Sequence, residues 1–483
     1  MRKHLSVFNF LKYPKEDLFK YLVGLLIVFI PLYPKFPFIL VPGSYVSVRL
    51  EDFVILACVF LWFLISIKTI DIKKPIGALR SVFEDKITFS FVIFWLVGAL
   101  SLAAAILITK SVSPSTGILH LFRRFEYMIL FFVGYSALRN KKNLMFFLNI
   151  FILTFVVAFS VGFLQKYFSF PVITTQNAEY SSGVALRFMP GAHLVSTFAG
   201  HYDLSLYILL ISSILIGILF VREKSELSSI QKRNNFLLIL ILCSGMWLLA
   251  LAASRTIFVS YILSICLLLF WLRKYLIMFL FVVFSFLVLS FSTNLIERYT
   301  RIFEVVFPQV QHIKDSILYN PKIIFEVNAA SESATLIDTT PAPTAVPVFE
   351  DRSTNIRLNA SWPRAIRAFT KNPLLGTGYS SITLATDNDF LRLLGEVGIL
   401  GFLSFITILV VIIKVLIRYV RNEKNNTVEK LFVMGYLCAL PGLLLTAVFI
   451  DIFEASKFAT IFWLISGFCV SIAFRKKINE DIS

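Results

Sequence analysis

Residues 390–417 read FLRLLGEVGILGFLSFITILVVIIKVLI. This run is long enough to cross a bilayer as a helix, because a hydrocarbon core of about 30 Å needs roughly 17–25 mostly apolar residues. Arg392 and Glu396 lie near its start, directly after a polar stretch that is rich in acids. A charged side chain at membrane depth costs about 2.5–3.5 kcal/mol on insertion scales, so these charges invite a functional explanation.

The whole chain has the composition of an integral membrane protein. Hydrophobic residues make up 58% and charged residues 16% of it, against about 45–50% and about 25% in soluble domains. Apolar runs long enough to cross lie near residues 19–33, 51–67, 87–107, 118–137, 144–166, 196–220, 235–251, 256–272, 275–294, 390–417, 431–449 and 458–474. We therefore expect an all-α fold, a polytopic membrane helix bundle with about twelve transmembrane helices.

Lysine and arginine gather in alternate connections between these runs. They cluster near residues 1–20, 68–86, 139–142, 222–233, 273–274, 418–424 and 475–477. By the positive-inside rule this side is cytoplasmic, with both termini inside, so we expect a multi-pass protein of the cytoplasmic (inner) membrane. The net charge of +17 is explained by these topology signals, and we expect no nucleic-acid partner.

The predicted topology divides the chain into three parts. Residues 1–294 form an N-terminal transmembrane region of about nine helices, and residues 390–483 hold the last helices and a cytoplasmic tail. Between them, residues 295–389 form a large extracytoplasmic loop. Residues 328–354 of this loop are rich in Ala, Ser, Thr and Pro, a composition typical of a low-complexity, flexible insertion.

The end of the large loop is predicted to be more ordered. Ser361 is a candidate N-cap, and Pro363 is tolerated in a first helical turn. Apolar side chains from Trp362 to Phe369 then share one face, with Arg364 on the opposite side. This pattern predicts a short amphipathic helix that rests on the membrane surface.

The cysteines do not indicate a metal site or a disulfide framework. All of them fall within predicted spans, at Cys58, Cys243, Cys266, Cys438 and Cys469. Their spacing is unlike that of zinc ligands, so we interpret them as packing residues and expect no metal and no cofactor.

A local motif joins the large loop to the helix that follows it. Its elements in chain order are Ser254-Arg255, the long outer loop, Arg357, Trp362, NPLLGTGY at 372–379 and DNDFL at 387–391. This order resembles the O-antigen ligase-related superfamily, which contains O-antigen ligases and the repeat-unit polymerases of bacterial envelope polysaccharides. The motif covers residues 357–401, and the helix count and loop placement extend the resemblance over most of the chain.

The resemblance implies a glycosyltransferase that acts on the outer face of the membrane. The donor would be a glycan linked through diphosphate to undecaprenol, and the acceptor a sugar hydroxyl, with no nucleotide sugar and no essential metal. Ligases of this superfamily place a histidine at the start of the helix after the large loop. Asp387 stands there in this chain, which favours a repeat-unit polymerase over an O-antigen ligase.

The candidate site residues follow from the chemistry of that transfer. A departing diphosphate develops negative charge, and arginine binds phosphate oxygens in a bidentate way while staying charged. The candidate diphosphate ligands are Arg187, Arg255, Arg357, Arg124 and Arg364. The attacking hydroxyl needs a base, for which Asp387 is the first candidate and Asp389 the second.

The same residues also permit plainer roles. Asp387 or Asn388 can cap the helix that follows, and Arg392 and Glu396 are four apart and can pair with each other. Small residues spaced by three favour close helix packing, at Gly395, Gly398 and Gly401. Charged residues in the last outer turn are predicted to be solvated, at Asp451, Glu454 and Lys457.

Two other classes of membrane protein remain as alternatives. A polysaccharide flippase or secondary transporter would also have about twelve spans, but such folds tend to show internal repeats, and none is evident here. A polyprenyl-phosphate sugar transferase of another fold would usually place acids in the first outer loop, whose residues 34–50 contain none. Both alternatives are therefore less favoured than the glycan ligase or polymerase.

Overall fold

The computed structural model describes most of the helical part of the chain. The described residues are 17–34, 37–40, 47–67, 84–138, 141–172, 188, 192–221, 235–290, 357–382 and 387–482. Arg187, a predicted diphosphate ligand, and the predicted insertion 328–354 lie outside these residues.

Apolar helices dominate the described residues. They are α1 (Asp17–Leu32), α2 (Leu50–Ile67), α4 (Lys86–Leu107), α5 (Pro114–Ala137), α6 (Lys141–Tyr167), α8 (His201–Leu219), α10 (Asn235–Ala252), α11 (Arg255–Trp271), α12 (Tyr275–Ser290), α17 (Trp362–Lys371), α18 (Asp389–Asn422), α19 (Val428–Ala447) and α20 (Ser456–Ile482). The π-helical turn η2 (Arg357–Ser361) directly precedes α17.

Each apolar run predicted to cross the membrane coincides with one of these helices. Within the described residues, six helices are long and apolar enough to span a bilayer, namely α4, α6, α8, α18, α19 and the part of α20 up to Arg475. Shorter apolar helices include α1, α11 and α12. The helical membrane architecture is thus confirmed, and the count of about twelve crossings stays a prediction.

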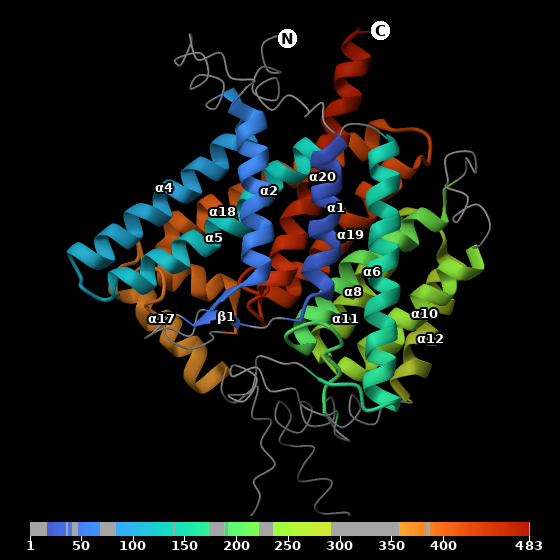
Figure 1. The fold of residues 1–483 in the computed structure, drawn as a ribbon, viewed down its shortest axis with the longest axis horizontal. Helices are drawn as coiled ribbons and strands as arrows, with labels where there is room; N and C mark the ends of the chain where they lie inside the picture. The colour runs from blue at the N-terminus through green and yellow to red at the C-terminus, as the bar shows by residue number, and fades with distance from the viewer. Residues whose placement is uncertain are drawn as a thin grey trace, which may run out of the picture.

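The helices pack into one bundle whose ends are distinct (Figure 1). The start of α1 and the end of α20 lie at the top of the view, and α17 lies at the opposite end. α8 and α20 are 89% buried over their most apolar windows, whereas α4 and α6 are 39% buried. The bundle therefore has a buried centre and an apolar perimeter, as expected for helices that face lipid.

The centre of the bundle depends on a close approach between α5 and α20. A Cβ at Gly467 would lie 2.0 Å from the Phe131 carbonyl oxygen, and one at Gly134 would lie 2.3 Å from the Leu464 carbonyl oxygen. Two glycines, one on each helix, thus let the backbones touch, in the way small residues do at membrane helix interfaces.

Two local features differ from the sequence-based expectation. A two-stranded antiparallel hairpin, β1 (Pro37–Leu40) and β2 (Ser47–Arg49), joins α1 to α2 and adds a short strand pair to a fold that is otherwise helical over the described residues. The prediction that Ser361 caps the surface helix is wrong. Ser361 is the last residue of η2, so its backbone is already helical. Its side chain makes no capping hydrogen bond.

Candidate active site

The apolar helix α18 is broken at Gly398, which has φ 70° and ψ −173°. A break leaves backbone groups of an apolar helix without their usual partners, and such groups need new ones. The loop 373–378 supplies them through the hydrogen bonds Thr377 N to Gly395 O (2.9 Å), Gly378 N to Glu396 O (2.8 Å), Ile399 N to Pro373 O (2.9 Å) and Leu400 N to Leu374 O (3.3 Å). The PLLGTG segment of the motif is therefore built into the interrupted helix.

Substitution of Gly398 should destabilise the protein. A Cβ there would lie 2.3 Å from the Leu374 carbonyl oxygen, and a positive φ combined with an extended ψ is a conformation essentially restricted to glycine, which costs other residues about 1–3 kcal/mol. We expect Gly398→Ala to lower the midpoint of thermal unfolding in detergent. Gly24→Ala is the matched control, because the nearest contacts of its Cβ are with side-chain ends. Equal midpoints for the two variants would contradict this account of the break.

The start of α18 separates the capping residue from the acid beside it. The side chain of Asn388 accepts hydrogen bonds from Phe390 N (3.1 Å) and Leu391 N (3.0 Å). Asn388 is thus the helix cap, and the carboxylate of Asp387 is left for another role. It lies 3.1 Å from a guanidinium nitrogen of Arg357.

The Asp387–Arg357 pair lies at the boundary between the bundle and its surroundings. The Arg357 side chain is 10% exposed and that of Asp387 33% exposed. Burial raises the pKa of the Asp387 carboxyl above its ordinary value, and the guanidinium of Arg357 partly offsets that rise. The pair therefore combines an accessible acid of raised pKa with a cation that is held in place.

An ion pair and two hydrogen bonds connect the turn between α19 and α20 with the start of α18, and each of the two segments supplies one carboxylate. Asp451 of the turn pairs with Arg392 of α18 at 2.8 Å. In return, the Asp389 carboxylate of α18 accepts hydrogen bonds from Ile452 N (2.6 Å) and Phe453 N (3.1 Å). Asp389, the second candidate base, is thus buried against backbone amides.

The prediction that the charged residues of this turn are solvated is wrong. Glu454 pairs with Arg124 of α5, whose guanidinium lies 5.7 Å from the centre of the Tyr379 ring. Lys457 is 1% exposed and donates hydrogen bonds to backbone carbonyls at Pro31, Tyr33 and Thr197. Packing against α1, α5 and α18 therefore buries Lys457 fully and leaves the Asp451 and Glu454 side chains only 12% and 18% exposed.

The structure brings two of the predicted residues into direct contact and shows the surroundings of the others. Arg357 and Asp387 are in contact, and Arg124 lies within electrostatic range of Asp389. Arg364 is half-buried on α17. Arg255 begins α11, which packs against α8, α12 and α19, and it is 8% exposed. Arg357, Asp387, Asp389 and Arg124, with Arg392, Asp451 and Glu454, are called the charged cluster below.

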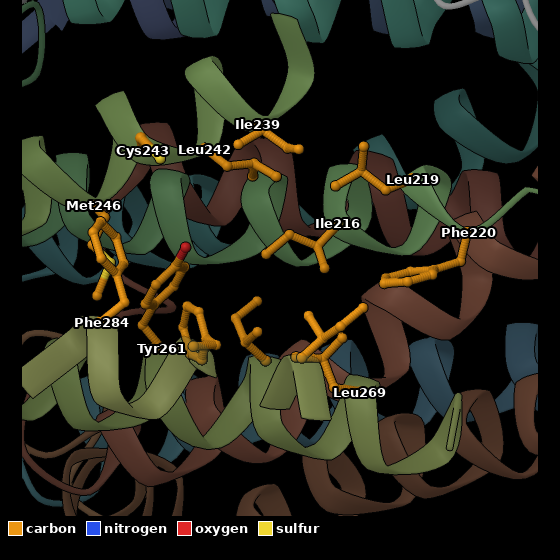
Figure 2. Close-up of a pocket in the computed structure, with 13 residues that line it drawn as sticks. Ile216, Leu219, Phe220, Ile239, Leu242, Cys243, Met246, Tyr261, Leu269 and Phe284 are labelled. Atoms are coloured by element: carbon orange, nitrogen blue, oxygen red, sulfur yellow. The ribbon is translucent and has the colours of Figure 1, made fainter. Parts of the chain in front are cut away.

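Apolar cavities lie away from the charged cluster. One of about 200 Å³ is lined by α8, α10, α11 and α12, and Figure 2 shows aliphatic and aromatic side chains around it, with Tyr261 and Cys243 among them. A second, of about 390 Å³, lies between α11, α18 and α19. These walls suit hydrocarbon and offer nothing to a diphosphate, so the charged cluster is the better candidate site.

The multi-pass apolar bundle makes the chain a membrane protein, and it has a polar candidate site at one end. An interrupted helix, α18, and an acid paired with an arginine at the start of that helix define the site. Residues 236–406 match the family model described as O-antigen ligase. This match to part of the chain supports the resemblance to the O-antigen ligase-related superfamily that the motif predicts, and that superfamily is a glycosyltransferase-like enzyme family. A comparison with curated proteins gave no match.

The matched range covers only part of the charged cluster. It includes Arg357, Asp387, Asp389 and Arg392 of the cluster, together with Arg255 and the break at Gly398. Arg124 and the turn 448–455 lie outside it, and the structure brings them to the same place. Sequence reasoning missed this turn as part of the candidate site, although its two acids, Asp451 and Glu454, in a short apolar connection were a signal.

Proposed function

We propose that this protein transfers a glycan from undecaprenyl diphosphate to a sugar hydroxyl on the outer face of the cytoplasmic membrane, as a repeat-unit polymerase. The observation that carries the proposal is the 3.1 Å contact between Asp387 and Arg357 at the start of α18. It supports a reaction that needs a base and a diphosphate ligand side by side. The family match supports glycan transfer of the ligase or polymerase type.

The proposed step is a displacement at the anomeric carbon of the donor glycan. The acceptor oxygen forms a bond to that carbon as the bond from the carbon to the diphosphate oxygen breaks. The hydroxyl proton passes to the Asp387 carboxylate, whose raised pKa suits proton acceptance. The departing diphosphate carries the electron pair away, and Arg357 stabilises its charge.

The other arginines are assigned to the same leaving group. Arg364 follows Arg357 on the next element, and Arg124 pairs with Glu454 within the charged cluster. We propose that both contribute positive potential near the diphosphate. Arg255 and Arg187 stay candidate ligands for the donor.

Deleting the gene for a polymerase and deleting the gene for a ligase change the surface glycan in different ways. Deleting the gene in the native host should leave surface glycan of a single repeat, with the chain-length ladder absent from a gel of the extracted glycan. This result is expected of a polymerase, because the first repeat is still attached to the surface acceptor when the polymerase is absent. Complementation with the wild-type gene should restore the ladder.

The ligase remains the second candidate because the matching family model carries that description. A ligase deletion would instead accumulate full-length polymer on the lipid carrier and leave none on the surface acceptor. That outcome would overturn the polymerase proposal while keeping glycan transfer. Donor trapped on the cytoplasmic face would point to a flippase and overturn both.

A further inference from the structure

The peptide group between Asp387 and Asn388 is held at both of its polar ends. Its carbonyl oxygen, on Asp387, accepts a hydrogen bond from Trp362 Nε1 at 3.1 Å. Its N–H, on Asn388, donates to Asp451 Oδ1 at 3.1 Å. Two side chains from different parts of the chain thus fix one peptide plane.

The two holding residues also belong to a common frame. The Trp362 ring centroid lies 6.4 Å from that of Phe449, which follows α19 and leads into the turn that carries Asp451. The other oxygen of Asp451 accepts from Arg392 at 2.8 Å. Each of the two side chains therefore has a second contact that favours its observed position, Trp362 with Phe449 and Asp451 with Arg392.

We propose that Trp362 and Asp451 form a peptide clamp that aims the Asp387 carboxylate. The Cα of Asp387 belongs to the clamped peptide, so fixing that plane limits the directions that its Cβ and carboxylate can take. Asp451 and Trp362 are positioning residues, since neither needs to touch the substrate. The inference rests on the proposed role of Asp387 as the base.

The clamp explains why an acid outside the helix can be well placed. Asp387 is not held by the hydrogen bonds within α18, because the helix begins at Asp389. A misplacement of about 1 Å in a catalytic group can lower a rate by about a hundredfold. Two hydrogen bonds to its peptide provide the placement that the helix does not.

The test uses full-length protein in nanodiscs, with lipid-linked glycan extracted from the native host as donor. Trp362→Phe keeps a ring and removes the N–H donor, and Asp451→Ala removes the acceptor. We expect each to lower kcat by about ten- to a hundredfold, with KM for the donor within about twofold of the wild-type value. Asp451→Asn keeps an oxygen for the Asn388 N–H and should retain more activity than Asp451→Ala.

A pH profile separates aiming from a general loss of structure. If the carboxylate moves relative to Arg357, the acid limb of the rate profile shifts in Trp362→Phe. Glu429→Gln is the matched control, because Glu429 pairs with Arg475 at the other end of α19 and α20. It should leave kcat and the pH profile unchanged. Should Asp451→Ala fail to fold, Trp362→Phe still carries the test, since it removes a single donor.

The outcomes distinguish this inference from the proposed function. Wild-type kcat and pH profile in Trp362→Phe and in folded Asp451→Ala, beside an inactive Asp387→Asn, would overturn the clamp and leave the base in place. Full activity in Asp387→Asn would overturn the proposed base and the clamp together. A fall in kcat in the clamp variants but not in Glu429→Gln, with donor KM preserved and with Asp387→Asn inactive, supports the inference.

Discussion

Asp387→Asn is expected to lower the rate of glycan transfer by about 10²–10⁴-fold, the usual contribution of a positioned general base. The amide cannot accept the proton of the attacking hydroxyl, but it has nearly the shape of the carboxylate. The helix start should survive the change, because Asn388 provides the cap. Initial rates on the lipid-linked donor, with unfolding midpoints in parallel, measure the two effects separately.

The pH dependence of the wild-type protein tests the same assignment. The carboxylate is the active form of a base, so the rate should fall as pH decreases through the pKa of Asp387. Since burial raises that pKa, the acid limb should begin at a higher pH than for an ordinary aspartate. The limb should be missing from whatever activity remains in Asp387→Asn.

Asp389→Asn serves as the comparison, because Asp389 is the second candidate base. Its carboxylate accepts two backbone N–H groups of the turn after α19, so we expect this change to weaken folding more than Asp387→Asn does. A folded but inactive Asp389→Asn, with an active Asp387→Asn, would exchange the roles of the two acids.

The helices could be predicted from the sequence because each apolar run carries its own signal. The run 256–272 became α11, Arg255–Trp271, and the run 390–417 lies inside α18. The break at Gly398 could not be predicted in the same way. The apolar pattern continues through it, and glycines spaced by three also fit a continuous, closely packed helix.

The part of the site that depends on distant contacts was the hardest to predict. The PLLGTG and DNDFL motifs located Asp387 and Arg357 because they lie in one stretch of the chain. The partner of Arg124 is 330 positions away, at Glu454, and no local pattern connects them. The sequence shows Asp451 and Glu454 as charges in a short turn, and only packing decides whether water reaches them.

Arg357→Ala should lower transfer by about 10²–10³-fold, as the loss of a donor to developing charge does in other enzymes. Unlike the Asp387 change, it should also weaken binding of the donor, because Arg357 is proposed to contact the diphosphate before and during the reaction. Arg357→Lys keeps the charge and loses the bidentate geometry, so its transfer rate and donor affinity should lie between those of the wild type and of Arg357→Ala. Donor binding in nanodiscs and initial rates are the two measurements.

Arg367→Ala is the matched control for Arg357→Ala, since Arg367 is an exposed arginine on the adjacent helix α17. It should keep wild-type binding and rate, and an equal loss in both variants would mean that general surface charge carries the effect.

The double variant that combines Arg357→Ala with Asp387→Asn adds a further test. Residues that act on one transition state are not additive, so it should be little slower than the worse single variant. Fully multiplicative losses would show that the pair seen at 3.1 Å does not act as a unit.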